Sequence, residues 1–318
     1  MVRPLTILLT VALAGATGVG RAVAADACLG VSQPVIDVHL HAYAKDGRWT
    51  ARAPSPSTGK PLEVIGEAAH RTATLDELTR AGIVRGIVSG DAGAQQRMID
   101  AAGGHLRAGI AIDEVTPAVL AEVRRLHAAG QLAMIGEVGT QYSGIAPNDP
   151  RLEPLWALAE ELDLPVGFHI HPGPPGGAYL GSPRLRQGIG DPLLLEEVLV
   201  RHPRLKLFVM HAGWPRGDEM IALLHAHPQV YVDIAVIDWA MAEKEFHRYL
   251  ERLIDLGYGK RIMFGSDQMV WTDAIGQAVA RINKAPFLTD DQKRDILFNN
   301  AVRFFGWTDL EKCGKRDG

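Results

Sequence analysis

The chain has 318 residues, 47% of them hydrophobic and 22% charged, so it is long enough to bury a large core as one domain. The formal net charge is -4, and no basic stripe or interleaving of aromatic and basic residues occurs, which argues against a nucleic-acid-binding protein. An enzyme acting on a small molecule is the class that these features favour.

Residues 1–25 have the layout of a secretory signal peptide. Arg3 precedes an apolar stretch at 5–19, and alanines near position 24 fit a cleavage site. The apolar stretch is too short and too rich in glycine for a membrane span, although an uncleaved N-terminal anchor is the alternative. We therefore expect a mature protein without a membrane span that is secreted or periplasmic.

Eight short apolar runs alternate with helical patterns along the rest of the chain. The runs cover residues 35–40, 83–89, 106–112, 132–138, 164–170, 205–210, 229–235 and 261–266. The helical patterns cover residues 75–82, with Thr74 as the expected cap, and 93–102, 116–129, 152–163, 192–201, 217–226, 240–256 and 272–283. This alternation predicts an α/β fold, a (β/α)8 TIM barrel spanning residues 33–308.

Two connections and one further helix lie outside this alternation. The segments 42–73 and 171–190 are much longer than usual strand-to-helix loops, and because both follow strands, they should overhang the active-site mouth. A final helix over 289–304 begins at a threonine cap with acids in its first turn. We expect this helix to pack against the outside of the barrel.

The only two cysteines, Cys28 and Cys313, lie near the two ends of the mature chain. In a closed barrel the first strand neighbours the last strand and helix, so the termini come close together. We predict a disulfide between them, formed in an oxidising compartment. Two unrelated surface thiols are the alternative.

Histidines and acids end several of the apolar runs. They are His39 and His41 in VIDVHLH, Glu137 in LAMIGE, His169 and His171 in LPVGFHIH, His211 in LKLFVMH and Asp267 in RIMFGSD. Imidazole nitrogens and carboxylate oxygens are typical ligands of a catalytic divalent metal, and a barrel brings its strand ends to one place. We therefore expect these residues to bind a divalent metal ion, most simply zinc.

The strand period assigns some of these residues directly. Residues two apart on a strand point to the same side, so His39 and His41 both face inward, with Asp37 one layer deeper. His169 is the better ligand on its strand. His171 precedes a proline and begins the loop, where contact with a substrate is as natural as ligation.

The roles of the remaining three residues stay open. Asp267 could bind metal, accept a proton from water, or cap the following helix. His211 could ligate a second metal or act as an uncoordinated general acid. Glu137 could bridge two metals, orient a histidine or form a structural salt bridge, so the sequence leaves one ion or two.

Residues beyond the strand ends form a candidate pocket. Trp214, Trp239, Gln268 and Trp271 could give it aromatic sides, or could pack between the loops and the barrel. The other histidines, at positions 70, 105, 127, 202, 225, 227 and 247, are interpreted as surface or structural residues.

In chain order, VIDVHLH, IGEVG, LPVGFHIH, VMHAGW and FGSD resemble the motifs of the amidohydrolase superfamily. The likeness is greatest to its amidohydrolase-related branch, which contains hydrolases and decarboxylases of the aminocarboxymuconate-semialdehyde type. The resemblance implies His39, His41, His169 and Asp267 around a divalent metal, with His211 as a catalytic or second-metal histidine. Glu137 matches a bridging glutamate of binuclear members, whereas His171 departs from the commoner pattern.

The leading hypothesis is hydrolysis of an ester, lactone or amide of a small molecule. Asp267 would accept a proton from metal-activated water, and Asp267 or His211 would protonate the leaving group. The alternative is a non-oxidative decarboxylase, in which a loop arginine would hold a substrate carboxylate. The candidate arginines are Arg48, Arg52, Arg184 and Arg186.

A third class is a non-catalytic binding protein on a retained barrel, which would have no need of an open metal site. The sequence does not determine the oligomeric state, and a homodimer is one assembly that it allows.

Overall fold

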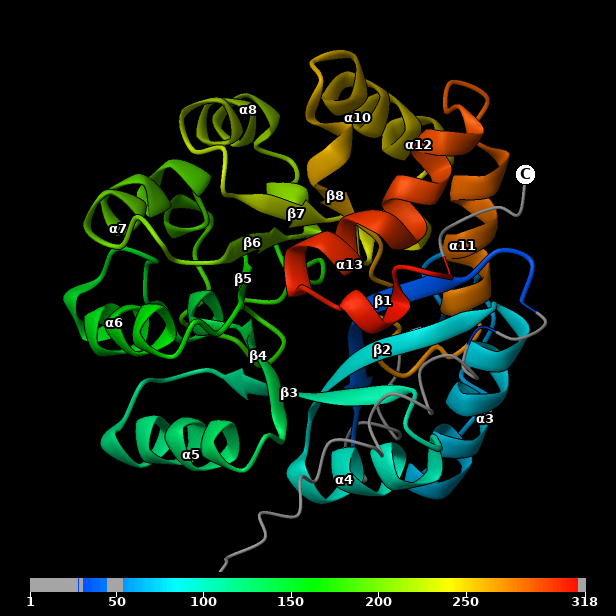
Figure 1. Cartoon of the computed structure of the whole chain (residues 1–318), viewed down its shortest axis with the longest axis horizontal. Helices are drawn as coiled ribbons and strands as arrows, with labels where there is room; N and C mark the ends of the chain where they lie inside the picture. Colours follow the sequence, from blue (N-terminus) through cyan, green and yellow to red (C-terminus); the bar gives the residue numbers. More distant parts are fainter. Residues whose placement is uncertain (1–27, 29–30, 45–53, 314–318) are drawn as a thin grey trace, which may run out of the picture.

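The computed structural model describes residues 28, 31–44 and 54–313, in which eight parallel strands alternate with helices around a barrel (Figure 1). The strands are β1 (Val35–Ala42), β2 (Ile83–Gly90), β3 (Leu106–Ile112), β4 (Leu132–Val138), β5 (Val166–His169), β6 (Leu207–Met210), β7 (Tyr231–Asp233) and β8 (Ile262–Met263). Each strand pairs with the next in chain order, which confirms the TIM barrel. The predicted signal peptide at 1–25 lies outside the described residues.

Hydrogen bonds from β1 to the segment that follows β8 close the barrel. Val38 N donates to Phe264 O at 3.1 Å, and Asp267 N donates to His39 O at 2.7 Å. One layer below His39, Asp37 Oδ1 accepts a hydrogen bond from Ser266 N at 3.0 Å. These bonds fix the position of Asp267 relative to the histidines of β1.

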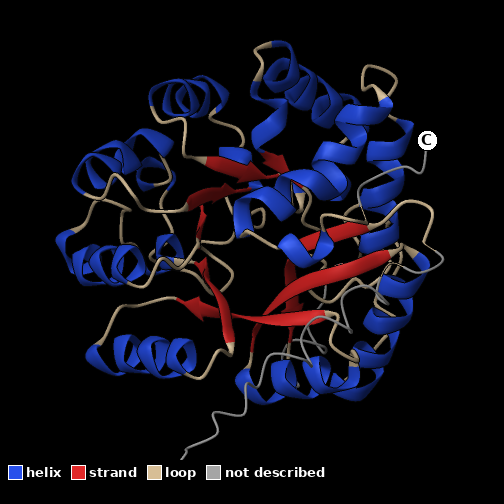
Figure 2. Ribbon diagram, in the orientation of Figure 1, coloured by secondary structure: helices blue, strands red, loops and turns tan. Residues whose placement is uncertain are grey.

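The helices surround the strands (Figure 2). They are α3 (Glu67–Arg80), α4 (Ala92–Ala101), α5 (Pro117–Ala128), α6 (Glu153–Glu161), α7 (Glu196–Arg201), α8 (Gly217–Ala226), α9 (Ile237–Ala240), α10 (Glu243–Asp255) and α11 (Ala274–Lys284). Among the described residues, no helix combines the length and the apolar character needed to cross a membrane.

The first helix begins earlier than predicted. α3 starts at Glu67 rather than near residue 75, so Thr74 is buried within the helix and does not cap it. The three buried residues of α3, His70, Thr74 and Leu78, recur every four residues, which places them on one face. The expectation was wrong because two of these three residues are polar and give little apolar periodicity.

The C-terminal helical segment closes one end of the barrel. It comprises α12 (Asp290–Arg294), a π-helical turn over Asp295–Asn299 and α13 (Asn300–Phe305). A capping box between Thr289 and Gln292 starts it, as the threonine suggested.

This segment packs on apolar side chains at the beginning of the strands. Phe298 and Phe304 share a cluster with Ile36, Phe208 and Met263, and the rings of Phe208 and Phe304 lie 5.6 Å apart. Figure 1 shows α13 across the centre of the barrel. The expected position on the outside of the barrel was therefore wrong, because the segment covers apolar side chains at the N-terminal end of the barrel.

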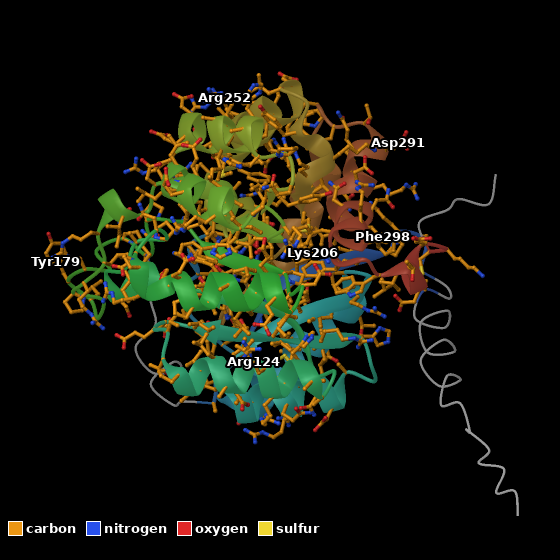
Figure 3. All side chains as sticks on the ribbon, turned by 60° about the vertical axis from the view of Figure 1, so that its left-hand side comes forward. Arg124, Tyr179, Lys206, Arg252, Asp291 and Phe298 are labelled. Atoms are coloured by element: carbon orange, nitrogen blue, oxygen red, sulfur yellow. A yellow bond between two sulfur atoms is a disulfide. The ribbon has the colours of Figure 1, made fainter. Side chains whose placement is uncertain are left out.

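The long connection after β5 has the expected extent. Between His169 and the 3₁₀ turn Pro192–Leu195, its only helical element is a second 3₁₀ turn at Gln187–Ile189. Tyr179 at its tip is 91% exposed and projects from the molecule (Figure 3).

The two cysteines are joined as predicted. A disulfide links Cys28, before β1, to Cys313, which follows α13. Both residues pack on the cluster at the closed end of the barrel. The bond therefore ties the two ends of the described fold together.

We expect thiol titration of the denatured, non-reduced protein to find no free cysteine. Replacing both cysteines by serine should lower the free energy of unfolding by about 2–4 kcal/mol, because the bond restricts a very long loop in the unfolded chain. Chemical denaturation measures this difference. Two titratable thiols in the wild-type protein would contradict the disulfide.

Candidate metal centre

The structure brings all six proposed metal ligands together at the C-terminal end of the barrel. They are His39 and His41 on β1, Glu137 on β4, His169 on β5, His211 directly after β6 and Asp267 after β8. Glu137 is partly exposed, and the other five side chains are buried. Glu137 is therefore the most exposed member of this set.

A first group of donor atoms surrounds one oxygen of Glu137. His41 Nε2 lies 3.4 Å and His39 Nε2 lies 3.7 Å from Glu137 Oε2. Asp267 Oδ1 lies 3.0 Å from His41 Nε2 and 4.0 Å from His39 Nε2. Ligands about 2.1 Å from a tetrahedral ion lie about 3.4 Å from one another, so the distances from the two histidines to each carboxylate oxygen are suitable.

A second group surrounds the other oxygen of the same carboxylate. His169 Nδ1 lies 2.5 Å from Glu137 Oε1, and His211 Nε2 lies 3.0 Å from His169 Nδ1. Glu137 therefore contributes one oxygen to each of two donor groups, both of which could hold a metal ion.

The residues fit a cation by a further criterion. His39 Nε2 and Asp267 Oδ1 are buried and make no hydrogen bond within the described part of the chain. Buried polar atoms are normally hydrogen bonded, and two such atoms that face each other call for a shared partner. A divalent ion would satisfy both.

The chain leaves the strands through unusual backbone conformations at two of these residues. His211 has a φ of 60° and Asp267 a φ of 45°, the left-handed region that costs a non-glycine residue about 1–3 kcal/mol. Gly265, in the GSD motif, is needed because a Cβ there would lie 2.8 Å from the Cβ of His39. These sharp turns aim the side chains into the site.

Electrostatic interactions polarise the first group. Burial alone would lower the pKa of His39, but Asp267, Asp233 and Glu137 raise it well above its usual value. Burial likewise opposes ionisation of Glu137, but His169 and His39 hold its pKa well below the usual range. Glu137 is therefore an anion that attracts positive charge.

Two further histidines of the site, His211 and His171, are held in the neutral form. Burial, with nearby His169 as an additional cause, lowers the pKa of His211 to about 4. Burial also lowers the pKa of His171 to about 2, with His211 and His169 as additional causes. Neutral imidazole is the form that ligates metal.

His171 and Trp214 lie together above the second donor group. The His171 ring is 5.0 Å from that of His211 and 5.6 Å from that of Trp214. His171 Nδ1 accepts a hydrogen bond from Gly173 N at 3.1 Å, so this ring is held by the first turn of the long loop. The arrangement makes His171 a wall of the site.

Two other pocket candidates support the site from behind. Gln268 is fully buried and holds the backbone of His41 through both its amide atoms, at 3.0 Å to N and 2.8 Å to O. Trp239 is also fully buried, donates to Ser266 O at 2.6 Å and packs against Trp271. Both side chains contact the protein rather than open space.

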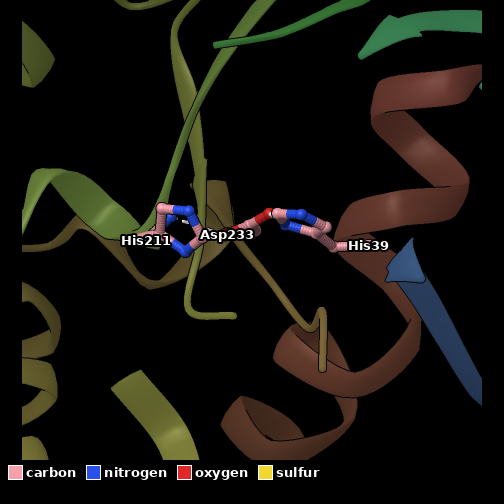
Figure 4. A group of neighbouring side chains, drawn as sticks. All are labelled: His39, His211 and Asp233. Carbon is pink, nitrogen blue, oxygen red and sulfur yellow. Dashed lines mark hydrogen bonds and ion pairs between the residues drawn. The ribbon is translucent and has the colours of Figure 1, made fainter. Parts of the chain in front are cut away.

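The sequence interpretation missed two residues that contact this site. Asp233 ends β7, and its Oδ2 lies 3.0 Å from His39 Nδ1 (Figure 4). The signal was present, since Asp233 is an acid within an apolar run like those of the other candidates. The Tyr142 ring lies 4.8 Å from the His169 ring, and no spacing in the sequence marked it.

The histidines assigned structural roles include one beside the site. His70 is buried, and its Nε2 donates to Met269 O at 2.8 Å. Burial lowers the pKa of this ring to about 4. His105 bonds Val84 O from the N-terminal end of β3, at the far end of the barrel.

The amidohydrolase family model matches residues 36–307. No curated protein is matched.

Three solved structures share the fold. An uncharacterized TIM-barrel protein from Bordetella bronchiseptica has 17% identity and a TM-score of 0.62, and the match covers 89% of this chain and 100% of that one. A 2-pyrone-4,6-dicarboxylic acid hydrolase, so described provisionally, from Pseudomonas putida has 18% identity and a TM-score of 0.56, over 86% and 98% of the chains. A 5-carboxyvanillate decarboxylase from Novosphingobium aromaticivorans, complexed with manganese, has 13% identity and a TM-score of 0.58, over 87% and 97%.

We expect His169→Ala to weaken binding of a divalent ion more than the roughly 10–100-fold that loss of a supporting residue costs. The reason is that His169 Nδ1 is the donor nearest to Glu137. Competition with a chromophoric chelator measures the affinity. His105→Ala is the matched control and should leave the affinity unchanged, whereas equal effects of the two substitutions would exclude His169 as a ligand.

Proposed function

The chain belongs to the amidohydrolase family, and from this premise and the geometry of the site we propose that it is a metal-dependent hydrolase. The substrate class is a small molecule with an ester, lactone or amide bond, which an activated water cleaves. The observation that carries the proposal is the buried Asp267 Oδ1, which lies 3.0 Å from His41 Nε2 and makes no hydrogen bond within the part of the chain that the structure describes. This is where a carboxylate could both face a metal ion and accept a proton.

The donor set supports a site for two ions, with zinc as the proposed metal. His39, His41, Asp267 and Glu137 Oε2 would hold one ion, and Glu137 Oε1, His169 and His211 would hold the other. The second ion would take the place of the proton that His169 Nδ1 donates to Glu137 Oε1. Nitrogen and carboxylate oxygen ligands of this kind suit zinc. Such ions lower the pKa of water and polarise a carbonyl group.

Different side chains have different roles in the proposed hydrolysis. Asp267 Oδ1 accepts the proton of the attacking water and returns it to the leaving group. His171, Trp214 and Tyr142 surround the donor groups and would form the walls against which the substrate is oriented.

Two of the four loop arginines considered for a decarboxylase are engaged within the loops. Arg184 Nη2 donates to Glu114 Oε1 at 3.0 Å, and Arg186 Nη1 donates to the backbone oxygens of Pro183 and Leu185. Both guanidinium groups are thus engaged within the loops, whereas a decarboxylase would need one to hold a substrate carboxylate. Arg48 and Arg52 lie outside the described residues.

The proposal includes export from the cytoplasm. The disulfide between Cys28 and Cys313 supports an oxidising compartment, and the signal-peptide pattern at 1–25 is consistent with it. A periplasmic or secreted enzyme would act on small molecules outside the cytoplasm.

We expect two zinc ions per chain in the purified protein, measured by elemental analysis, and loss of hydrolysis after exhaustive chelation. Activity should return when zinc is added back. Full activity of the chelated protein, with its metal content verified as zero, would refute the metal-dependent scheme. If only one zinc ion per chain is found, Glu137 would ligate metal through only one of the two donor groups.

Asp267→Asn should lower kcat by about 10²–10⁴-fold, because an amide cannot accept the proton of the attacking water. The assay compares hydrolysis of an ester and lactone panel with CO₂ release from aromatic carboxylates, and the metal content of the variant is measured alongside. Asp255→Asn on α10 is the control and should retain full activity. CO₂ release without ester or lactone turnover would contradict the proposed hydrolysis and support decarboxylation instead.

A further inference from the structure

We infer that Asp233 is a positioning residue that selects which ring nitrogen of His39 faces the metal centre and holds the backbone turn that carries His211. The inference rests on the proposed metal site. Asp233 is fully buried at the end of β7 and lies between the two histidines (Figure 4). Each of its carboxylate oxygens has a separate set of partners.

Asp233 Oδ2 fixes the His39 ring. It lies 3.0 Å from His39 Nδ1, and because a carboxylate can only accept, Nδ1 must carry the proton. Nε2 is therefore the nitrogen that remains for ligation. It faces Glu137 and Asp267 and makes no hydrogen bond to any described residue. A carboxylate behind a ligating histidine is known to orient the ring and increase its basicity.

Asp233 Oδ1 fixes the turn that carries His211. It accepts hydrogen bonds from the backbone N–H groups of His211, at 2.7 Å, and Ala235, at 3.1 Å. The oxygen of Ala235 in turn lies 2.9 Å from His211 Nδ1, so Nδ1 donates to it. His211 Nε2 is left without a proton and faces His169 Nδ1 at 3.0 Å.

An asparagine could not replace this carboxylate, although it has nearly the same shape. Its single oxygen can accept from the two backbone N–H groups, but its NH₂ group then meets His39 Nδ1. Nδ1 would have to accept, Nε2 would carry the proton, and His39 could not ligate through Nε2. In the reversed orientation, the NH₂ group would face two backbone donors.

The test measures Zn²⁺ affinity of the full chain by competition with a chromophoric chelator. Asp233→Asn should bind Zn²⁺ about 10–100-fold more weakly than wild type. Asp295→Asn is the matched control, because Asp295 is a buried carboxylate that bonds Lys260 and Asn299 at the other end of the barrel. The control should keep the wild-type affinity.

A double-substitution cycle separates positioning from general stabilisation. In a His39→Ala background, Asp233→Asn should add less than about threefold to the loss, because the ring that it orients is gone. Additive losses, or an affinity of Asp233→Asn within threefold of wild type, would overturn the inference and leave the hydrolase proposal intact. Failure of wild type to bind Zn²⁺ would overturn both.

A measurement on the wild-type protein alone covers the case in which Asp233→Asn does not fold. In the Zn²⁺-loaded, ¹⁵N-labelled protein, the His39 ring should show a proton on Nδ1 and none on Nε2, with its signals assigned by their loss in His39→Gln. A His39 ring that lacks a proton on Nδ1 would overturn the inference. The readout does not depend on turnover.

Discussion

The packing of two carboxylates, one buried and one mostly buried, against the same two imidazoles is the constraint on which the site depends. Glu137 and Asp267 each lie within 4.0 Å of both His39 and His41. Burying charge is costly unless it is compensated, and imidazoles alone compensate two carboxylates only when they are protonated. A divalent cation would provide the same compensation while leaving the imidazoles neutral, so the charge balance and the donor spacing favour the same occupant.

The barrel supports this arrangement by separating an apolar end from a polar one. At the N-terminal end, Phe298 and Phe304 cover Phe208 and complete an apolar cluster. At the C-terminal end, His211 and Asp267 adopt left-handed backbone conformations that their own chemistry does not favour. The stability of the closed end can offset the cost of these conformations, because both ends belong to the same cooperative sheet.

Much of this could be predicted because the strand period is simple. Two-residue spacing placed His39 and His41 on one side, and closure of eight strands brought Glu137, His169, His211 and Asp267 to the same end. The start of α3 was missed because two of its three buried residues, His70 and Thr74, are polar. The position of the last helical segment depends on its contacts with Phe208 and Met263 at the N-terminal end of the barrel. No local sequence pattern shows that these two side chains need a cover there.

The role of Asp233 could not be predicted from the end of its own strand alone. The acid was visible in the apolar run that contains it, yet its role depends on which atoms its two oxygens reach, His39 Nδ1 on one side and the His211 backbone on the other. Those partners are 194 and 22 residues away in the chain. Ligand types can be recognised from residue identity, but the protonated nitrogen of each ligand is set by such distant neighbours. Whether a histidine ring presents an unprotonated nitrogen to a metal ion therefore depends on the closed barrel rather than on any one motif.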